Sequence, residues 1–330
     1  MEYVPTVYAV RDNLHFLKTS GRCPLTDSGI AVDWGASGIA FYADCEGEIK
    51  VHYQKPTDTA IYFTVYIDGV RSEQRYTFPR TGGKTVIATG LSRGPHLIEI
   101  YKQSQIEAAL LCEFTALEFS GRFLEKPRDS AFRIEFVGDS ITAGVCNLGI
   151  NGKTGAEPEY SDTTQTYAFL AARELRADFA VIAQGGAAFT PNTGTGVQMA
   201  AIYEYTDFVR YPDRKWAFQD NCDLVVVNLG TNDFSKTAAE ITKYALELSH
   251  TLRTYHPDAA MIFCSGMMNN QVGPLLREMA ENLGGEGAGF YYVRLPQNNE
   301  GSGTHPNAAG NAQAADVLVD FIRKKGLATG

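Results

Sequence analysis

Short runs of β-branched and aromatic residues, separated by turn residues, fill the chain from about residue 5 to residue 125. This spacing predicts antiparallel strands, because such strands need only tight connections whereas parallel strands need long crossovers. We therefore expect an N-terminal β-sandwich of the jelly-roll type. Its candidate strands are Gly38–Tyr42, Glu48–Tyr53, Ala60–Ile67, Lys84–Thr89, His96–Lys102 and Leu110–Phe119.

Beyond residue 130, apolar runs alternate with amphipathic stretches of helical period. This alternation predicts a parallel sheet with helices on both faces, and such sheets bind ligands at the carboxyl ends of their strands. The candidate strands are Phe132–Val137, Phe179–Ala183, Leu224–Leu229, Ala260–Ser265 and Gly289–Leu295, and the candidate helices are Thr164–Leu175, Ala238–Tyr255, Val272–Leu283 and Asn307–Lys325.

A polar segment that contains a proline, Leu124–Ser130, separates the two patterns and suits a domain boundary. We predict a β-sandwich domain over residues 1–126 and an α/β domain over residues 127–330. A chain of 330 residues exceeds the size at which a single hydrophobic core stops growing, which also favours two domains.

Composition narrows the classes of partner. The net charge of −9 and the lack of any Lys/Arg-rich run argue against nucleic acid, since phosphate binding relies on clustered positive charge. No apolar run is long enough to cross a bilayer. The six cysteines lack the spacing of a zinc site or a disulfide framework. Without signal-peptide features the chain is expected in the cytoplasm as written, or secreted if a signal peptide has been removed.

Chemistry-bearing residues follow three successive strands. Ser140, in Gly138-Asp139-Ser140, follows the first strand, and small residues around a serine let the chain turn sharply and expose the hydroxyl. Gly185-Gly186 follows the second strand, where a backbone N–H is able to point at a developing oxyanion, and Asn232 follows the third with a side-chain N–H. Each block alone is equally compatible with an ordinary turn or, for Asn232, with a helix N-cap.

His305, in Thr304-His305-Pro306, lies just before the last predicted helix. Of the six histidines, only this one is expected in a loop at the carboxyl edge of the parallel sheet; the others fall in the β region or near the end of the helix that finishes at Tyr255. A serine, a glycine, an asparagine and a histidine are therefore expected at one edge, in the places that acyl transfer requires.

These four blocks, in this order, resemble the SGNH or GDSL hydrolase superfamily. The resemblance implies a three-layer α/β/α hydrolase domain in which Ser140 is the nucleophile and His305 the general base. It also implies an oxyanion hole made of the N–H groups of Ser140 and Gly186 and the side chain of Asn232. Gly185 remains an alternative to Gly186, because the glycine doublet leaves the alignment uncertain by one residue.

The whole chain is similar to carbohydrate esterase family 2, whose members join a β-sandwich to a hydrolase domain and remove acetyl groups from sugars. The resemblance implies an acetylated mono- or oligosaccharide substrate, such as a xylo- or manno-oligosaccharide, and no cofactor or metal. One departure from the superfamily is Ser302, which stands where an aspartate usually orients the histidine. The resemblance implies a Ser–His dyad whose ring is held by a backbone carbonyl, with Glu300, Asn298 or Asn299 as alternatives.

Other residues have less specific roles. Trp216 is a candidate sugar platform, and a core tryptophan is at least as compatible with its position. Asp139 and Asp233 are interpreted as caps of turns around the site. Two further functions stay open: a GDSL lipase or thioesterase acting on longer acyl chains, and an inactive carbohydrate-binding relative. The sequence leaves the sugar, the hydroxyl and the oligomeric state undetermined.

Overall fold

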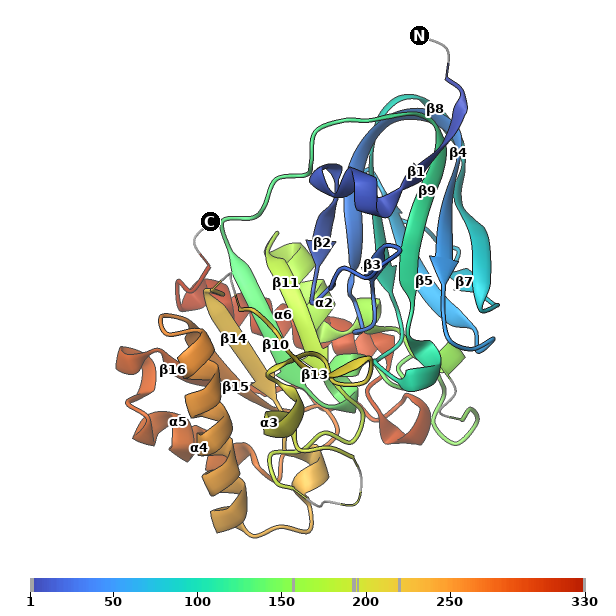
Figure 1. Cartoon of the computed structure of the whole chain (residues 1–330). Coiled ribbons are helices and arrows are strands. Elements are labelled where there is room, and N and C mark those ends of the chain that lie inside the picture. The colour runs from blue at the N-terminus through green and yellow to red at the C-terminus, as the bar shows by residue number, and fades with distance from the viewer. Residues whose placement is uncertain (1–2, 156–157, 192–193, 195, 219–220, 329–330) are drawn as a thin grey trace.

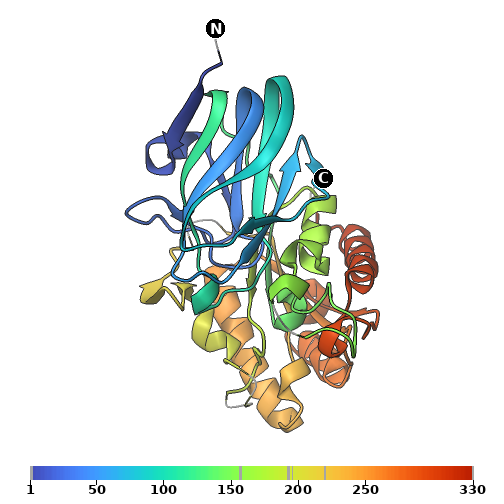
Figure 2. The ribbon, with the colours of Figure 1, turned by 90° about the vertical axis from the view of Figure 1, so that its right-hand side faces the viewer.

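The computed structural model describes residues 3–155, 158–191, 194, 196–218 and 221–328. The chain forms an antiparallel β unit followed by an α/β unit, and the β unit lies above the α/β unit in two perpendicular views (Figure 1, Figure 2). The expected fold class, all-β followed by α/β, is confirmed. β9 ends at Phe123 and β10 begins at Arg133, so the joining segment contains the boundary expected after residue 126, which stays a prediction.

The β unit is one continuous antiparallel sheet in the order β1-β9-β4-β8-β5-β6, with β2, β3 and β7 paired to its members. Its strands are β1 (Pro5–Ala9), β2 (Lys18–Ser20), β3 (Ile30–Ala31), β4 (Gly38–Gln54), β5 (Ile61–Ile67), β6 (Val70–Arg71), β7 (Tyr76–Phe78), β8 (Gly82–Lys102) and β9 (Glu113–Phe123).

Four of the expected strands are halves of two long ones. The runs 38–42 and 48–53 join into β4, and 84–89 and 96–102 join into β8. Gly47 in β4 and Gly90 in β8 have positive φ of 80° and 66°, which lets each strand bend and continue where the sequence suggests a turn. Apolar side chains from both halves of each strand share one buried cluster.

The α/β unit has a five-stranded parallel sheet in the order β11-β10-β14-β15-β16. Its strands are β10 (Arg133–Gly138), β11 (Asp178–Ala183), β14 (Leu224–Asn228), β15 (Ala260–Gly266) and β16 (Phe290–Leu295); an antiparallel hairpin adds β12 (Tyr205–Asp207) and β13 (Tyr211–Lys215). The helices are α1 (Ser140–Ala143), α2 (Tyr167–Glu174), α3 (Met199–Ile202), α4 (Ala238–Tyr255), α5 (Gly273–Asn282) and α6 (Ala308–Lys324).

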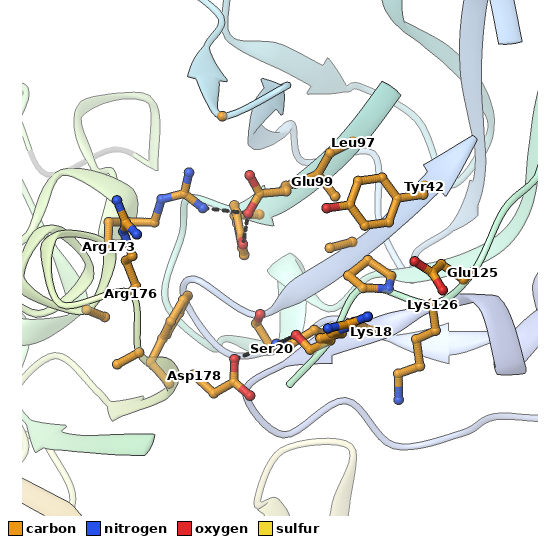
Figure 3. Close-up of a pocket in the computed structure, with 18 residues that line it drawn as sticks. Lys18, Ser20, Tyr42, Leu97, Glu99, Glu125, Lys126, Arg173, Arg176 and Asp178 are labelled. Carbon is orange, nitrogen blue, oxygen red and sulfur yellow. Dashed lines mark hydrogen bonds and ion pairs between the residues drawn. The ribbon is translucent and has the colours of Figure 1, made fainter. Parts of the chain in front are cut away.

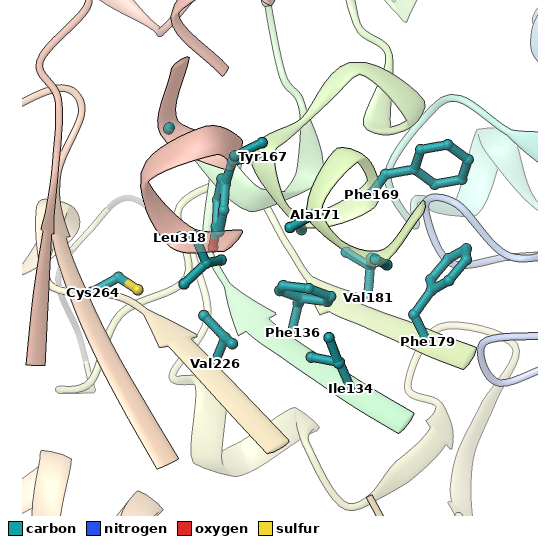
Figure 4. Packing of buried hydrophobic residues seen from close by; sticks show 14 of the residues in the cluster. Ile134, Phe136, Tyr167, Phe169, Ala171, Phe179, Val181, Val226, Cys264 and Leu318 are labelled. Carbon is teal, nitrogen blue, oxygen red and sulfur yellow. The ribbon is translucent and has the colours of Figure 1, made fainter. Parts of the chain in front are cut away.

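Helices cover both faces of the parallel sheet. Phe136 and Val226 pack under α2 and α6, as Figure 4 shows, while Val137 and Val227 belong to the cluster on the opposite face, with α3, α4 and α5. Strands buried on both faces explain the continuous apolar runs in the sequence. The strand order reverses between β10 and β14, and ligands of such sheets bind at this kind of switch point.

Polar contacts join the two units. The Trp34 indole donates to the carbonyl of Thr206 over 2.8 Å, and Arg210 pairs with the buried carboxylate of Asp33 over 2.7 Å. Lys18 pairs with Asp178 over 2.5 Å, and Arg173 pairs with Glu99 over the same distance. These last two pairs line a hollow of about 770 Å³ between β2, β4 and β8 on one side and α2 and β11 on the other (Figure 3).

Candidate active site

Three strands end side by side at the edge where the chemistry-bearing residues lie. Gly138 at the end of β10 is the register partner of both Ala183 in β11 and Asn228 in β14. The blocks that contain Ser140, Gly186 and Asn232 each begin within a few residues of these strand ends. The parallel register therefore brings together three segments that are far apart in the sequence.

Ser140 is the first residue of the short helix α1, and it is buried. Asp139 caps this helix, because its carboxylate accepts a hydrogen bond from the backbone N–H of Ile141 over 2.9 Å. Gly138 has no room for a side chain, since a Cβ there would lie 2.1 Å from Oγ1 of Thr142. A glycine at position 138 is thus required by the tight passage from strand to helix.

His305 contacts Ser140 directly. Its Nε2 lies 2.9 Å from Oγ of Ser140, and its Nδ1 lies 3.2 Å from the main-chain carbonyl oxygen of Ser302. A carbonyl only accepts, so this contact fixes the proton on Nδ1 and leaves the Nε2 lone pair to accept the serine proton. This is the geometry of a nucleophile and its general base.

The surroundings of His305 favour its neutral form. Burial lowers the pKa of this imidazole below its ordinary value of 6.5, and hydrogen bonds to the backbone carbonyls of Ser302 and Gly303 offset part of that effect. A neutral imidazole is the form that accepts a proton. Lowering the pKa therefore keeps the base available in weakly acidic solution.

The side chain of Ser302 does not orient the ring. Its hydroxyl donates to the carbonyls of Thr154 and Gly155, which belong to the loop after α1. The alternatives Glu300 and Asn298 are occupied elsewhere, since both side chains accept hydrogen bonds from Asn307. The ring of His305 is thus held by main-chain carbonyls, with that of Ser302 3.2 Å from Nδ1.

Each of the two glycines after β11 is favoured at its position for a different structural reason. The N–H of Gly185 donates to Oε1 of Gln105 over 2.6 Å, and a Cβ on Gly185 would lie 2.9 Å from that same oxygen. Gly186 has a φ of 77°, a left-handed conformation that favours glycine. Gln105 thus binds the Gly185 N–H, and the assignment of Gly186 as the oxyanion donor in this block stays a prediction.

Asn232 lies in the short turn Thr231–Asp233 and is not a helix cap, because α4 begins later with Thr237 as its cap. Its Nδ2 donates one hydrogen bond to the carbonyl of Ala187 over 2.8 Å. A side-chain amide carries two N–H groups, so this bond holds the amide in place and leaves a second N–H for a ligand. Asn232 thereby links the third block to the second.

The two aspartates act on the backbone around the site. The buried Asp233 accepts from the N–H groups of Phe189 and Thr190 over 3.0 and 2.9 Å, which ties the third block to the segment after Gly186. Burial and the nearby charge of Asp233 raise the pKa of Asp139 to about 7. Both residues hold turns in place, as the sequence suggested.

The structure does not bring Trp216, the candidate sugar platform, together with Ser140. Trp216 borders a hollow together with Arg133 and Glu135, which lie at the start of β10, whereas Ser140 follows the end of that strand. Its indole ring faces the guanidinium of Arg22 at 5.9 Å. Trp216 follows the hairpin strand β13, whose direction the sequence pattern did not reveal.

Sequence reasoning overlooked Phe234, which directly follows Asp233 and is 66% exposed. Exposed large apolar side chains next to a reactive site are frequent ligand contacts. The feature of the sequence that pointed to Phe234 was its position two residues after Asn232, at the carboxyl edge of the sheet and ahead of the α4 cap.

Comparison with known proteins places this geometry in a family. Residues 136–313 match the GDSL-like Lipase/Acylhydrolase family. Cellulase/esterase CelE of Acetivibrio thermocellus is 28% identical over 279 residues, which cover 80% of this chain and 34% of that protein. The chain therefore spans about a third of the length of this relative.

An acetylxylan esterase/glucomannan deacetylase of Cellvibrio japonicus is 23% identical over 271 residues and 71% of each chain. A family two carbohydrate esterase from Clostridium thermocellum, solved with cellohexaose, superposes with a TM-score of 0.86 at 25% identity over 94% of this chain and 99% of the other. With a matching family domain over more than half of its length, the chain belongs to the GDSL-like lipase/acylhydrolase family.

Proposed function

We propose that this protein is a serine esterase that removes O-acetyl groups from carbohydrates, such as xylo- or manno-oligosaccharides. The observation that carries the proposal is the contact between Nε2 of His305 and Oγ of Ser140 at 2.9 Å, with the opposite ring nitrogen held by a main-chain carbonyl. A serine that donates to a neutral imidazole in this way is activated for attack on an ester.

The first half of the proposed reaction forms an acyl-enzyme. Oγ of Ser140 attacks the acetyl carbonyl carbon while its proton passes to Nε2 of His305. The carbonyl oxygen becomes an oxyanion, for which the backbone N–H groups of Ser140 and Gly186 and the amide of Asn232 are the proposed donors. As the tetrahedral intermediate collapses, the C–O bond to the sugar breaks and His305 returns the proton to the sugar oxygen.

The second half releases acetate. Water attacks the acetyl-serine ester, and His305 takes a proton from that water and returns it to Oγ of Ser140 as the ester bond breaks. The positive charge on the imidazolium is stabilised by a carbonyl dipole and not by a carboxylate. This arrangement gives a weaker base than a triad with aspartate, because among the residues that the structure describes the partner of Nδ1 is a carbonyl dipole and not a full negative charge.

Two observations support a carbohydrate as the alcohol part of the substrate. The similar proteins named above are a cellulase/esterase, an acetylxylan esterase/glucomannan deacetylase and a family two carbohydrate esterase that was solved with cellohexaose. In this chain, Phe234 follows Asn232 by two residues and exposes a flat apolar ring, on which the apolar face of a sugar is able to pack. We propose Phe234 as the sugar platform in place of Trp216.

The substrate class is tested by comparing acetate release from acetylated xylo- and manno-oligosaccharides with hydrolysis of butyryl and octanoyl nitrophenyl esters. The proposal predicts efficient release of acetate from sugars and a rate that falls as the acyl chain lengthens. A preference for octanoyl esters would reassign the protein to the lipid esterases. No Ser140-dependent hydrolysis of any ester would leave a carbohydrate-binding protein as the remaining account.

A further inference from the structure

The end of β8 and the residues that follow it form one of the segments through which the β unit contacts the candidate active site. Lys102 is the last residue of β8 and is buried; its ammonium group donates to the carbonyls of Asp33 and Gln105 over 2.5 and 3.1 Å. This pair of bonds anchors the backbone of Gln105 to the core of the β unit. The position of the Gln105 side chain is therefore set by the β unit.

The same segment also contacts the block that contains Ser140. The carbonyl of Gln103 accepts hydrogen bonds from Oγ1 of Thr163 over 2.8 Å and from its backbone N–H over 2.7 Å. The Thr163 hydroxyl lies 2.7 Å from the carbonyl of Ala143, the last residue of α1. The residues from 102 to 105 thus lie between the loop behind α1 and the loop after β11.

The side chain of Gln105 spans the gap to the glycine doublet. Its Oε1 accepts the Gly185 N–H over 2.6 Å, and its Nε2 donates to the exposed carboxylate of Glu107 over 2.6 Å. The Glu107 contact fixes which end of the amide faces Gly185, because only the oxygen end is able to accept. This bond orients the Gln184–Gly185 peptide, which directly precedes the peptide that carries the Gly186 N–H.

We propose that Gln105, contributed by the β unit, is a positioning residue that fixes the Gly185–Gly186 loop in the conformation needed for oxyanion stabilisation. The inference rests on the proposed function, because it concerns the donor at Gly186. Donors stabilise an oxyanion only when they are held at hydrogen-bond distance from it before the reaction. Without Gln105, the Gly185 N–H loses its acceptor, and the turn closed by the Ala187 N–H on the Gln184 carbonyl loses one of the bonds that hold it.

The first test replaces Gln105 with methionine, which has a similar length and lacks the strong acceptor. We expect kcat on 4-nitrophenyl acetate to fall by about 10- to 100-fold, the range for a donor displaced by about 1 Å, with KM within about twofold. The matched control is Gln74→Met, the same chemical change at an exposed position of the β unit. It is expected to keep kcat and KM.

A second readout separates positioning from general damage to the fold. Phenylboronic acid forms a tetrahedral adduct with an active-site serine, and its inhibition constant depends only on folded molecules. The proposal predicts that Gln105→Met raises this constant by a factor similar to the fall in kcat. A variant that merely unfolds more easily would contain fewer folded molecules, so its total activity would fall while the inhibition constant stayed unchanged. That result would overturn the proposal.

Rescue provides a third readout. In the double variant Gln105→Glu with Glu107→Gln, the carboxylate at 105 accepts from Gly185 and the amide at 107 donates to it, so both hydrogen bonds are restored with no change in net charge. We expect this variant to recover part of the kcat lost in Gln105→Met. If Gln105→Met does not fold, Gln105→Asn, which withdraws the amide by one methylene, is measured in its place with the same expected direction.

Two failures are distinguishable. Wild-type protein without Ser140-dependent ester hydrolysis would refute the proposed function. Active wild-type protein with unchanged kcat and unchanged boronic acid inhibition in Gln105→Met would overturn the role of Gln105 alone.

Discussion

The imidazole Nδ1 of His305 lies 3.2 Å from the main-chain carbonyl oxygen of Ser302, while the hydroxyl of Ser302 is bonded to carbonyls of another loop. The residue that occupies the usual aspartate position therefore contributes its backbone to the ring and its side chain to the loop that contains Gly155. An aspartate is not needed at this position to set the tautomer of His305.

This relationship predicts that restoring the aspartate does not improve the enzyme. In Ser302→Asp, the carboxylate would face the carbonyls of Thr154 and Gly155, which it is unable to bond when ionised. We expect no gain in kcat and a loss of about 1–3 kcal/mol in the free energy of unfolding. Kinetics and denaturant unfolding measure the two effects.

The matched control is Ser302→Ala, which removes the hydroxyl and keeps the main-chain carbonyl. Its kcat is expected within about threefold of wild type, with a loss of about 1 kcal/mol in unfolding free energy. A clear rise of kcat in Ser302→Asp would show that the side chain at 302 is able to reach the imidazole.

The pKa of His305 predicts the acid limb of the pH profile. Burial lowers this pKa below 6.5, so the neutral, active imidazole persists to lower pH and the midpoint of the limb in kcat/KM falls below 6.5. Between the folded and the ordinary pKa the unfolded chain binds more protons, so the contribution of His305 to stability rises with pH through that window.

Asp139 is a second group whose titration could produce the acid limb, because its pKa is raised to about 7 and it lies next to Ser140. A variant of Asp139 is therefore the control. In Asp139→Asn the side-chain oxygen is still able to accept from the Ile141 N–H, so the acid limb is expected to persist below 6.5. A limb that disappears in this variant would assign the titration to Asp139. A midpoint at or above 6.5 in the wild type would contradict the effect of burial on His305.

Asn232 is expected to act mainly on the transition state. Asn232→Ala removes a proposed oxyanion donor and should lower kcat by about 10²- to 10³-fold, with little change in KM. Asn232→Asp keeps the size of the side chain but faces both the oxyanion and the Ala187 carbonyl with negative charge, so its loss should be larger. A kcat within threefold of wild type in Asn232→Ala would remove Asn232 from the proposed oxyanion hole.

The two candidate sugar platforms, Phe234 and Trp216, are distinguished by the effect of their alanine variants on KM for an acetylated oligosaccharide. Phe234→Ala should raise KM for an acetylated oligosaccharide roughly two- to tenfold, the effect of losing one aromatic contact, and should leave 4-nitrophenyl acetate almost unaffected. Trp216→Ala should leave both KM values unchanged, because Trp216 lies near the strand starts. A rise in KM with Trp216→Ala and none with Phe234→Ala would restore the platform expected from the sequence.

The periodic pattern predicted the parallel sheet well because its central strands β10, β14 and β15 are buried on both faces and the strands are separated by helices or long loops. It divided β4 and β8 into four strands, because Gly47 and Gly90 look like turns in a sequence and act as bends in the structure. Register along a bent strand depends on distant partners, which no local pattern contains.

For the candidate site, too, some residues were predictable from the sequence and others were not. Ser140 and His305 were expected together because each directly follows or precedes a predictable element. The role of Gln105 was not predictable, since it depends on a contact between two units 80 positions apart. The position of Trp216 relative to Ser140 was not predictable for the same reason, because the direction of the hairpin before it is set by tertiary contacts.

The most direct test of the central claim is the initial rate of 4-nitrophenyl acetate hydrolysis by wild type, Ser140→Ala and His305→Ala, with the folded state of each verified by circular dichroism. The account predicts turnover by the wild type and a loss of about 10³-fold or more in either variant, with no further loss when both are combined, because the two residues act as one unit. Hydrolysis that persists in a folded Ser140→Ala variant would contradict it.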